Sequence, residues 1–138
     1  MATLEWSNEY SIGVPAMDAD HRDLLDMCNR YLEAVYGREN LEHLISLLDR
    51  IILRTQAHFQ AEERMLDRHG YPGLAIHKAE HDRLLRDAEA LSYRMRTDQG
   101  ETGLEGIVRE TTTFLGSWLL EHIRHNDRPY QPFLRSLI

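Results

Sequence analysis

Apolar residues recur every three or four positions along four long stretches of the chain, which is the spacing of one face of an α-helix. Two signals mark where such helices would end, namely Gly37 and the breaker cluster Gly70-Tyr71-Pro72-Gly73. No sustained period-two run and no hairpin turn indicates a β-strand. The sequence therefore predicts an all-α protein with four helices, at about residues 18–36, 40–68, 74–96 and 103–127.

Short breaks separate the predicted helices, so neighbouring helices should run antiparallel. Residues 1–138 then form a single domain, an up-down-up-down antiparallel four-helix bundle. An N-terminal arm, residues 1–17, and a short C-terminal tail, residues 129–138, should pack outside it. Thr102, three residues before Glu105, fits a capping box that opens the fourth helix.

The composition narrows the class of protein. Of the 138 residues, 42% are hydrophobic, which is enough for a buried core. The formal charge of −7 argues against nucleic acid and anionic membranes as partners, because both attract basic surfaces. No apolar stretch is long enough to span a bilayer, and Glu5 and Glu9 interrupt any signal peptide. We expect a cytoplasmic protein, and a monomer because no second hydrophobic stripe is evident.

The eight histidines are the unusual feature of the composition, whereas the single cysteine, Cys28, excludes an internal disulfide and a Cys-rich zinc site. Pairs of histidines and acids spaced i,i+4 share a helix face. Six such polar residues fall on the stripes that face the bundle interior: His21, His58, Glu62, His77, His81 and His122.

These six residues also share one end of the predicted bundle. The first and third helices begin at this end, and the second and fourth helices end there. At a rise of ~1.5 Å per residue, all six lie within roughly 15 Å of it. A buried polar group without a partner costs about 1–3 kcal/mol, and a metal ion removes that cost by binding the lone pairs. The pattern predicts a metal site, whose ligand types suit zinc, iron, copper or nickel.

Asp127 completes the predicted ligand set, but its spacing departs from a regular helix. It follows His122 by five residues, which turns it about 140° away on an ideal α-helix. We therefore predict a local wide turn between these two residues. Of the remaining histidines, His43 lies at the opposite end, and His69 lies past the end of the second helix. His125 is a weak candidate ligand, and Cys28 is expected to be a small buried hydrophobic residue.

The chain resembles a single-domain bacterial hemerythrin over nearly its whole length. The resemblance is carried by the first-helix His21 and by the motifs HFQAE, HKAEH and HIRHND, which start at His58, His77 and His122. It implies two irons, one bound by His77, His81 and His122 and the other by His21 and His58. Glu62, Asp127 and a solvent-derived oxo or hydroxo group would bridge them.

The same resemblance implies reversible dioxygen binding by a carrier, storage or sensing protein that is not an enzyme. The second iron would have one protein ligand fewer, and dioxygen would bind there. No spare acid or base that would drive O–O cleavage is evident in the sequence. The recipient of the dioxygen is left open. The expected dioxygen pocket, which the family implies, is apolar: Leu24, Phe59, Trp118, Leu119 and Ile123.

Other functions fit the sequence less well. Ferritin-like di-iron oxidases use a Glu-x-x-His motif, and no histidine here has a glutamate three residues before it. A di-iron oxidase or peroxidase is nevertheless the main alternative. A metal phosphohydrolase is suggested only by the adjacent His81 and Asp82, which diverge by about 100° on a helix. A purely structural metal site is disfavoured because structural sites are normally closed.

Overall fold

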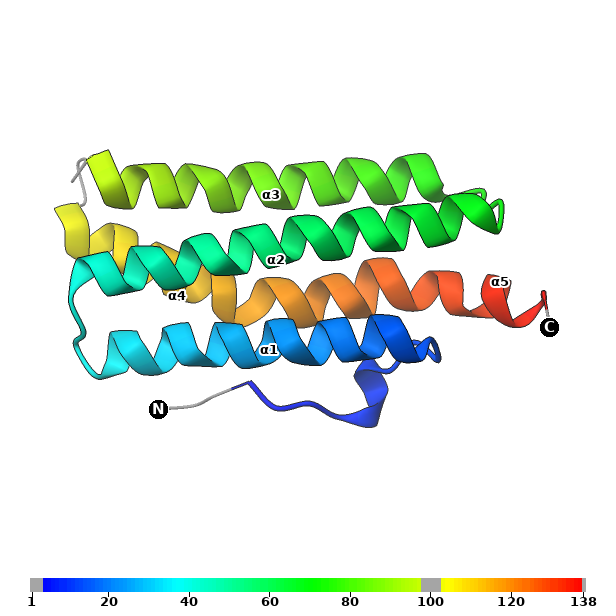
Figure 1. The fold of residues 1–138 in the computed structure, drawn as a ribbon, viewed down its shortest axis with the longest axis horizontal. Helices are drawn as coiled ribbons and strands as arrows, with labels where there is room; N and C mark the ends of the chain where they lie inside the picture. The colour runs from blue at the N-terminus through cyan, green and yellow to red at the C-terminus, as the bar shows by residue number, and fades with distance from the viewer. Residues whose placement is uncertain (1–3, 98–102, 138) are drawn as a thin grey trace.

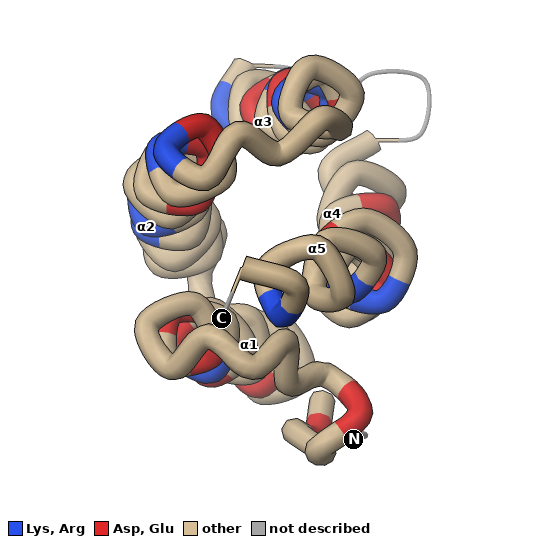
Figure 2. The backbone as a smooth tube through the Cα atoms, turned by 90° about the vertical axis from the view of Figure 1, so that its right-hand side faces the viewer, with Lys and Arg blue, Asp and Glu red and all other residues tan. Residues whose placement is uncertain are grey.

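The fold is dominated by four long helices that lie side by side. The computed structural model describes residues 4–97 and 103–137. The chain reverses direction at each connection (Figure 1), and the view along the bundle shows the helices arranged around a common centre (Figure 2). The predicted antiparallel four-helix bundle is therefore confirmed. The helices are α1 (Pro15–Tyr36), α2 (Leu41–Arg68), α3 (Leu74–Thr97) and α4 (Gly103–His122).

The helix ends follow local chemistry. Helix α1 begins at Pro15, whose fixed φ suits a first helical turn, and it ends at Gly37. The side chain of Asn40 caps α2 by accepting a backbone hydrogen bond at 2.8 Å. Gly70 turns the chain toward α3 with φ of +68°, a left-handed conformation that glycine adopts without strain. The capping box expected at Thr102 lies outside the described residues.

The C-terminal segment differs from the expected simple tail. Regular α-helix ends at His122, and the chain then makes a wide turn followed by two short helical segments. Helical structure continues through Pro129, because this residue falls in the opening turn of the first of these two segments. Figure 1 shows that the last segment lies at the same end of the bundle as the start of α1. The three segments are η2 (Ile123–Asp127), η3 (Arg128–Tyr130) and α5 (Gln131–Arg135).

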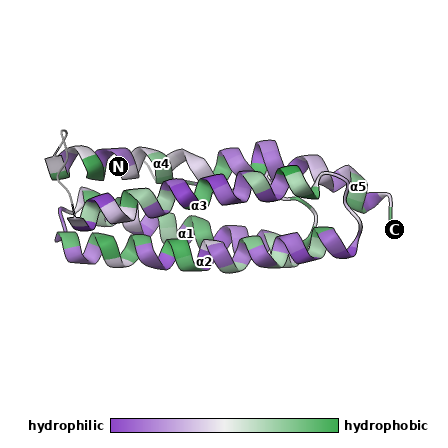
Figure 3. Cartoon of the chain, turned by 90° about the horizontal axis from the view of Figure 1, so that it is seen from above, coloured by the Kyte–Doolittle hydropathy of each residue, from purple (hydrophilic) through white to green (hydrophobic). Residues whose placement is uncertain are grey.

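Away from the predicted metal ligands, the buried core is mainly apolar, with the hydroxyl residues Thr55, Ser92 and Thr111 as the polar exceptions among the described residues. Each long helix carries both hydrophobic and hydrophilic residues along its length (Figure 3). Residues such as Leu48, Ile107 and Leu115 are at most 1% exposed. No helix in the described part of the chain combines the length and apolar character needed to cross a membrane.

The N-terminal arm is bound to the outside of α1. The backbone of Leu4 donates to the Asn29 side chain at 2.7 Å and accepts from it at 2.8 Å. The Asp18 carboxylate accepts a hydrogen bond from the backbone N–H of Ile12 at 2.9 Å. These contacts fix the arm beside the end of the bundle where the predicted ligands gather.

Candidate metal centre

All seven predicted ligands are buried together at one end of the bundle. None of them is more than 4% exposed. Their donor atoms form two overlapping groups, and within each group the atoms lie no more than 4.8 Å apart. Glu62 and Asp127 belong to both groups. The larger group adds His77, His81 and His122, and the smaller group adds His21 and His58.

The Glu62 carboxylate lies between the two groups. Its Oε1 atom is 2.6 Å from Nε2 of His77 and 3.0 Å from Nε2 of His81. Its Oε2 atom faces the other group, 3.6 Å from Nε2 of His58 and 3.9 Å from Nε2 of His21. One oxygen is therefore directed to each group of imidazoles, as in a carboxylate that bridges two cations.

Asp127, which follows α4, repeats this arrangement. Its Oδ1 atom lies 3.1 Å from Nε2 of His77 and 3.2 Å from Nε2 of His122. Its Oδ2 atom lies 3.1 Å from Nε2 of His21. Two carboxylates from different helical segments thus span the same pair of imidazole groups.

The expected wide turn places Asp127 in this position. Residues Ile123–Asp127 form one turn of π-helix, in which the backbone takes more residues per turn than an α-helix. The five-residue spacing from His122 therefore still directs both side chains to the interior, and Asp127 is fully buried. The predicted departure from α geometry is confirmed.

Several donor atoms in the cluster have no hydrogen-bond partner among the described residues. These atoms are both carboxylate oxygens of Asp127 and the Nε2 atoms of His81 and His122. Nε2 of His21 also lies 2.9 Å from Nε2 of His58, so that two ring nitrogens face each other. Such a set of converging lone pairs is costly when buried and is satisfied by cations. The donor set fits a pair of metal ions.

The electrostatics of the cluster favour ionised carboxylates. Burial alone would raise the pKa of Asp127, but the adjacent imidazoles of His122, His21 and His77 outweigh it and hold that pKa well below its usual value. Burial likewise opposes a charge on His77. The contacts with Asp127 and Glu62 nevertheless raise the pKa of His77 to about 10. In the metal-free protein a proton on His77 therefore offsets carboxylate charge, and a bound metal ion would replace that proton.

Three further polar residues support the cluster, and sequence reasoning did not find them. The Asp20 carboxylate lies 2.9 Å from Nδ1 of His58, and the Glu63 carboxylate lies 2.7 Å from Nδ1 of His81. These contacts leave the Nε2 atom of each ring free for the cluster. In addition, the hydroxyl of Tyr130 donates a hydrogen bond to Oε2 of Glu62 at 3.1 Å.

The five residues of the expected dioxygen pocket are all buried, with exposed fractions of 6% or less. The Phe59 ring stacks on the His81 imidazole with centroids 3.6 Å apart. The Trp118 ring lies 6.2 Å from Phe59 and 6.4 Å from His122. Aromatic rings therefore line the cluster on this side.

The histidines that were not predicted to be ligands lie outside the cluster. His43, His69 and His125 are exposed. Cys28 is fully buried, and burial raises the pKa of its thiol to about 12. It therefore behaves as the small hydrophobic residue that was expected.

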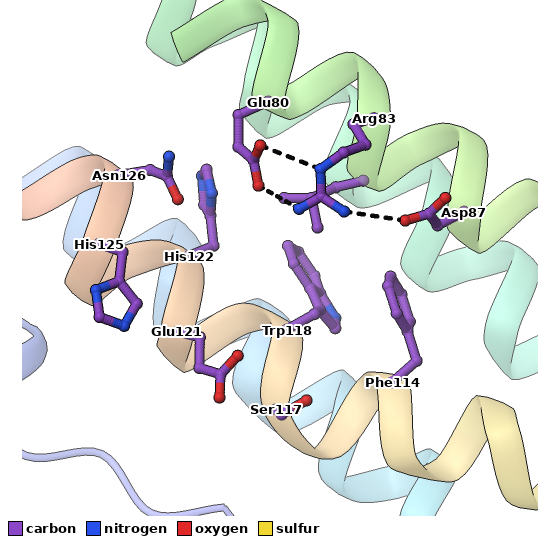
Figure 4. Close-up of a pocket in the computed structure, with 11 residues that line it drawn as sticks. Glu80, Arg83, Asp87, Phe114, Ser117, Trp118, Glu121, His122, His125 and Asn126 are labelled. Atoms are coloured by element: carbon purple, nitrogen blue, oxygen red, sulfur yellow. Dashed lines mark hydrogen bonds and ion pairs between the residues drawn. The ribbon is translucent and has the colours of Figure 1, made fainter. Parts of the chain in front are cut away.

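A hollow of about 390 Å³ lies between α3 and α4 beside the cluster. His122 and Trp118 line it from α4, and Glu80 and Arg83 line it from α3 (Figure 4). Arg83 binds Glu80 and also donates to Asp87 at 3.2 Å. The hollow brings solvent-exposed polar groups close to one predicted ligand.

Comparison with known proteins agrees with this geometry. The model of the hemerythrin HHE cation-binding domain matches residues 12–134. The chain belongs to the hemerythrin family. This membership confirms the resemblance carried by the histidine motifs.

Individual members of the hemerythrin family match almost the whole chain. A bacteriohemerythrin of Stenotrophomonas maltophilia is 32% identical over 130 residues, which cover 94% of this chain and 80% of the relative. A bacteriohemerythrin of Methylococcus capsulatus is 31% identical over 137 residues, covering 99% of this chain and all of the relative. A crystal structure of wild-type hemerythrin superposes with a TM-score of 0.80 at 30% identity, covering 95% of this chain and 97% of that chain.

Proposed function

We propose that this chain, as one hemerythrin-like domain, binds dioxygen reversibly at a pair of non-haem irons. Members of the hemerythrin family, to which this chain belongs, bind non-haem iron and dioxygen and are not enzymes, which supports this function over the oxidase or peroxidase alternative. One structural observation supports the paired centre most directly. Glu62 and Asp127 each direct one oxygen toward each of two imidazole groups.

The two donor groups are unequal, and this difference supports a binding position for dioxygen. His77, His81 and His122 would hold one iron, and His21 and His58 would hold the other. Glu62 and Asp127 would bridge the irons with a solvent-derived oxo or hydroxo group. The second iron would have one imidazole fewer, which would leave a position for dioxygen there. When bound, ferrous iron supplies the electrons that dioxygen accepts.

The protein's part in reversible binding is to keep the site dry and free of proton donors. Phe59, Trp118 and the other three proposed pocket residues are apolar and buried, so they exclude bulk water. The Tyr130 hydroxyl is engaged by Glu62 and is not free to protonate a ligand. Cleavage of the O–O bond would need a positioned acid.

The test is an optical titration of the purified, iron-loaded protein. Reduced protein exposed to air should develop visible charge-transfer bands, and these should fade again under argon over repeated cycles. Glu62→Ala should abolish the bands, and His43→Ala should preserve them. Bands that never form, or rapid turnover of peroxide in place of reversible binding, would refute the proposal.

The cytoplasmic location, the monomeric state and the absence of nucleic-acid binding stay predictions.

A further inference from the structure

Two imidazoles of the cluster are held from outside by carboxylates that follow a common pattern. Asp20 of α1 reaches His58 of α2, and Glu63 of α2 reaches His81 of α3. Each carboxylate belongs to the helix that precedes the imidazole in the chain. Each is also the direct sequence neighbour of a proposed ligand, His21 or Glu62, on its own helix.

The imidazole of α4 lacks the corresponding contact. Nε2 of His122 faces the cluster, 3.2 Å from Asp127, so Nδ1 points away from it. Nδ1 is buried, and within residues 4–97 and 103–137 it has no hydrogen-bond partner. An imidazole that binds a metal through Nε2 keeps its proton on Nδ1 and needs an acceptor there. The Nδ1 atom of His122 thus lacks the acceptor that a metal-bound imidazole needs.

If a carboxylate of α3 held the imidazole of α4 in the same way, the residue in that position would be Glu80. This residue lies on α3, directly before His81, and it shares the 390 Å³ hollow with His122 (Figure 4). The Glu80 carboxylate and the His122 ring therefore line the same hollow.

In the present structure the Glu80 carboxylate is bound by Arg83, so Arg83 and His122 compete for it. Arg83 has a second partner, since it also donates to Asp87 at 3.2 Å. Arg83 therefore keeps its ion pair with Asp87 when the Glu80 side chain turns toward His122. All four side chains, Glu80, Arg83, Asp87 and His122, line the same hollow.

We propose that Glu80 is a positioning residue that accepts a hydrogen bond from Nδ1 of His122 when Nε2 of that ring binds a metal ion. Arg83 then pairs with Asp87 alone. This inference rests on the proposed function, because it assigns an outer partner to one proposed ligand. It gives each of the last three long helices one imidazole held by a carboxylate of the preceding helix.

The test compares Glu80→Ala and Arg83→Met in the iron-loaded protein. Two readouts report the His122 ring itself: the midpoint potential of the iron pair, and the paramagnetically shifted Nδ1–H resonance in NMR spectra. Glu80→Ala should raise the potential and speed exchange of that proton, because the ring becomes a weaker electron donor. It should also weaken metal binding by about 10–100-fold. Arg83→Met should not speed that exchange, because in the iron-loaded protein Arg83 pairs with Asp87 and no longer binds Glu80.

Glu121→Ala is the matched control. Glu121 also adjoins a proposed ligand in sequence and lines the same hollow, but it is exposed. Glu121→Ala should leave the midpoint potential and the exchange of the Nδ1–H proton unchanged. Glu80→Gln keeps an oxygen acceptor and should restore part of the wild-type values.

Three results would overturn the inference. The first is a shift in the same direction for Glu80→Ala and Arg83→Met, which would show that their ion pair is merely structural. The second is a response to Asn126→Ala in place of Glu80→Ala, which would assign the acceptor to that neighbouring amide. The third is no response to Glu80→Ala. A wild-type protein without paired iron or reversible bands would instead refute the proposed function, so the two failures are distinguishable.

Discussion

The hydrogen bond from Tyr130 to Glu62 is the buried contact whose energetic contribution is most easily isolated. The hydroxyl donates to Oε2 of Glu62 at 3.1 Å, and both side chains are fully buried. Burial, together with the charge of Glu62, raises the pKa of Tyr130, so the hydroxyl keeps its proton. Tyr130→Phe removes only one oxygen. The ring contacts with His77 and Tyr71, at 5.6 and 6.0 Å, remain.

The size of the effect follows from the charge of the acceptor. A hydrogen bond to a charged group contributes about 1.5–3 kcal/mol. Glu62 also has a contact of 2.6 Å with His77, so it is not left unpaired in the variant. The loss should therefore fall in the lower part of that range, about 1.5–2 kcal/mol. For a domain of this size, such a loss lowers the unfolding midpoint by roughly 5–10 °C.

The assay is urea unfolding of the metal-free protein followed by circular dichroism. Metal-free protein is used because a bound ion adds its own contribution to the free energy of unfolding. Tyr71→Phe is the control, since Tyr71 is only partly buried and the ring is otherwise the same. Its effect should stay within about 0.5 kcal/mol.

Two results would refute this reasoning. One is a loss below about 0.5 kcal/mol for Tyr130→Phe, the value expected of a surface substitution. The other is an equal loss in a Glu62→Gln background, because a double-mutant cycle should show coupling between groups in contact.

Three other predictions concern the ligands and the arm. Asp127→Ala should lose the paired centre, whereas His43→Ala should keep it, as measured by iron analysis. Despite burial, two neighbouring carboxylates raise the pKa of His77 to about 10, so its proton stabilises the metal-free fold below about pH 6.5. This contribution is lost as pH rises through about 10. Urea unfolding should follow that change, and calorimetry in buffers of different ionisation enthalpy should detect a proton released when metal binds. Asn29→Ala removes two hydrogen bonds to Leu4 and should cost about 1–2 kcal/mol, with faster amide exchange at Leu4.

The sequence was sufficient to predict the bundle and the convergence of the seven side chains. Residues such as His58 and His81 stand on otherwise apolar stripes, where a polar residue conflicts with the hydrophobic period. Because these residues lie near helix starts or ends, their positions along the chain place them at one end of an antiparallel bundle. The five-residue gap from His122 to Asp127 conflicts with the α-helical period, and the π turn resolves that conflict.

The outer partners could not be predicted in this way. Asp20 and Glu63 directly adjoin ligands, so on a helix they lie about 100° from the interior stripe and read as solvent-facing charges. Their contacts depend on which neighbouring helix lies beside them. Tyr130 lies in residues 129–138, which were expected to form a tail outside the bundle, and the η3 turn brings its hydroxyl to Glu62.

The central claim is that two ions share Glu62 and Asp127. Anomalous diffraction at the iron edge from crystals of the iron-loaded protein tests it directly. We expect two separate iron peaks per chain, one bonded to His77, His81 and His122 and the other to His21 and His58, with both carboxylates bound to each. A single peak, or a carboxylate that contacts only one ion, would contradict it.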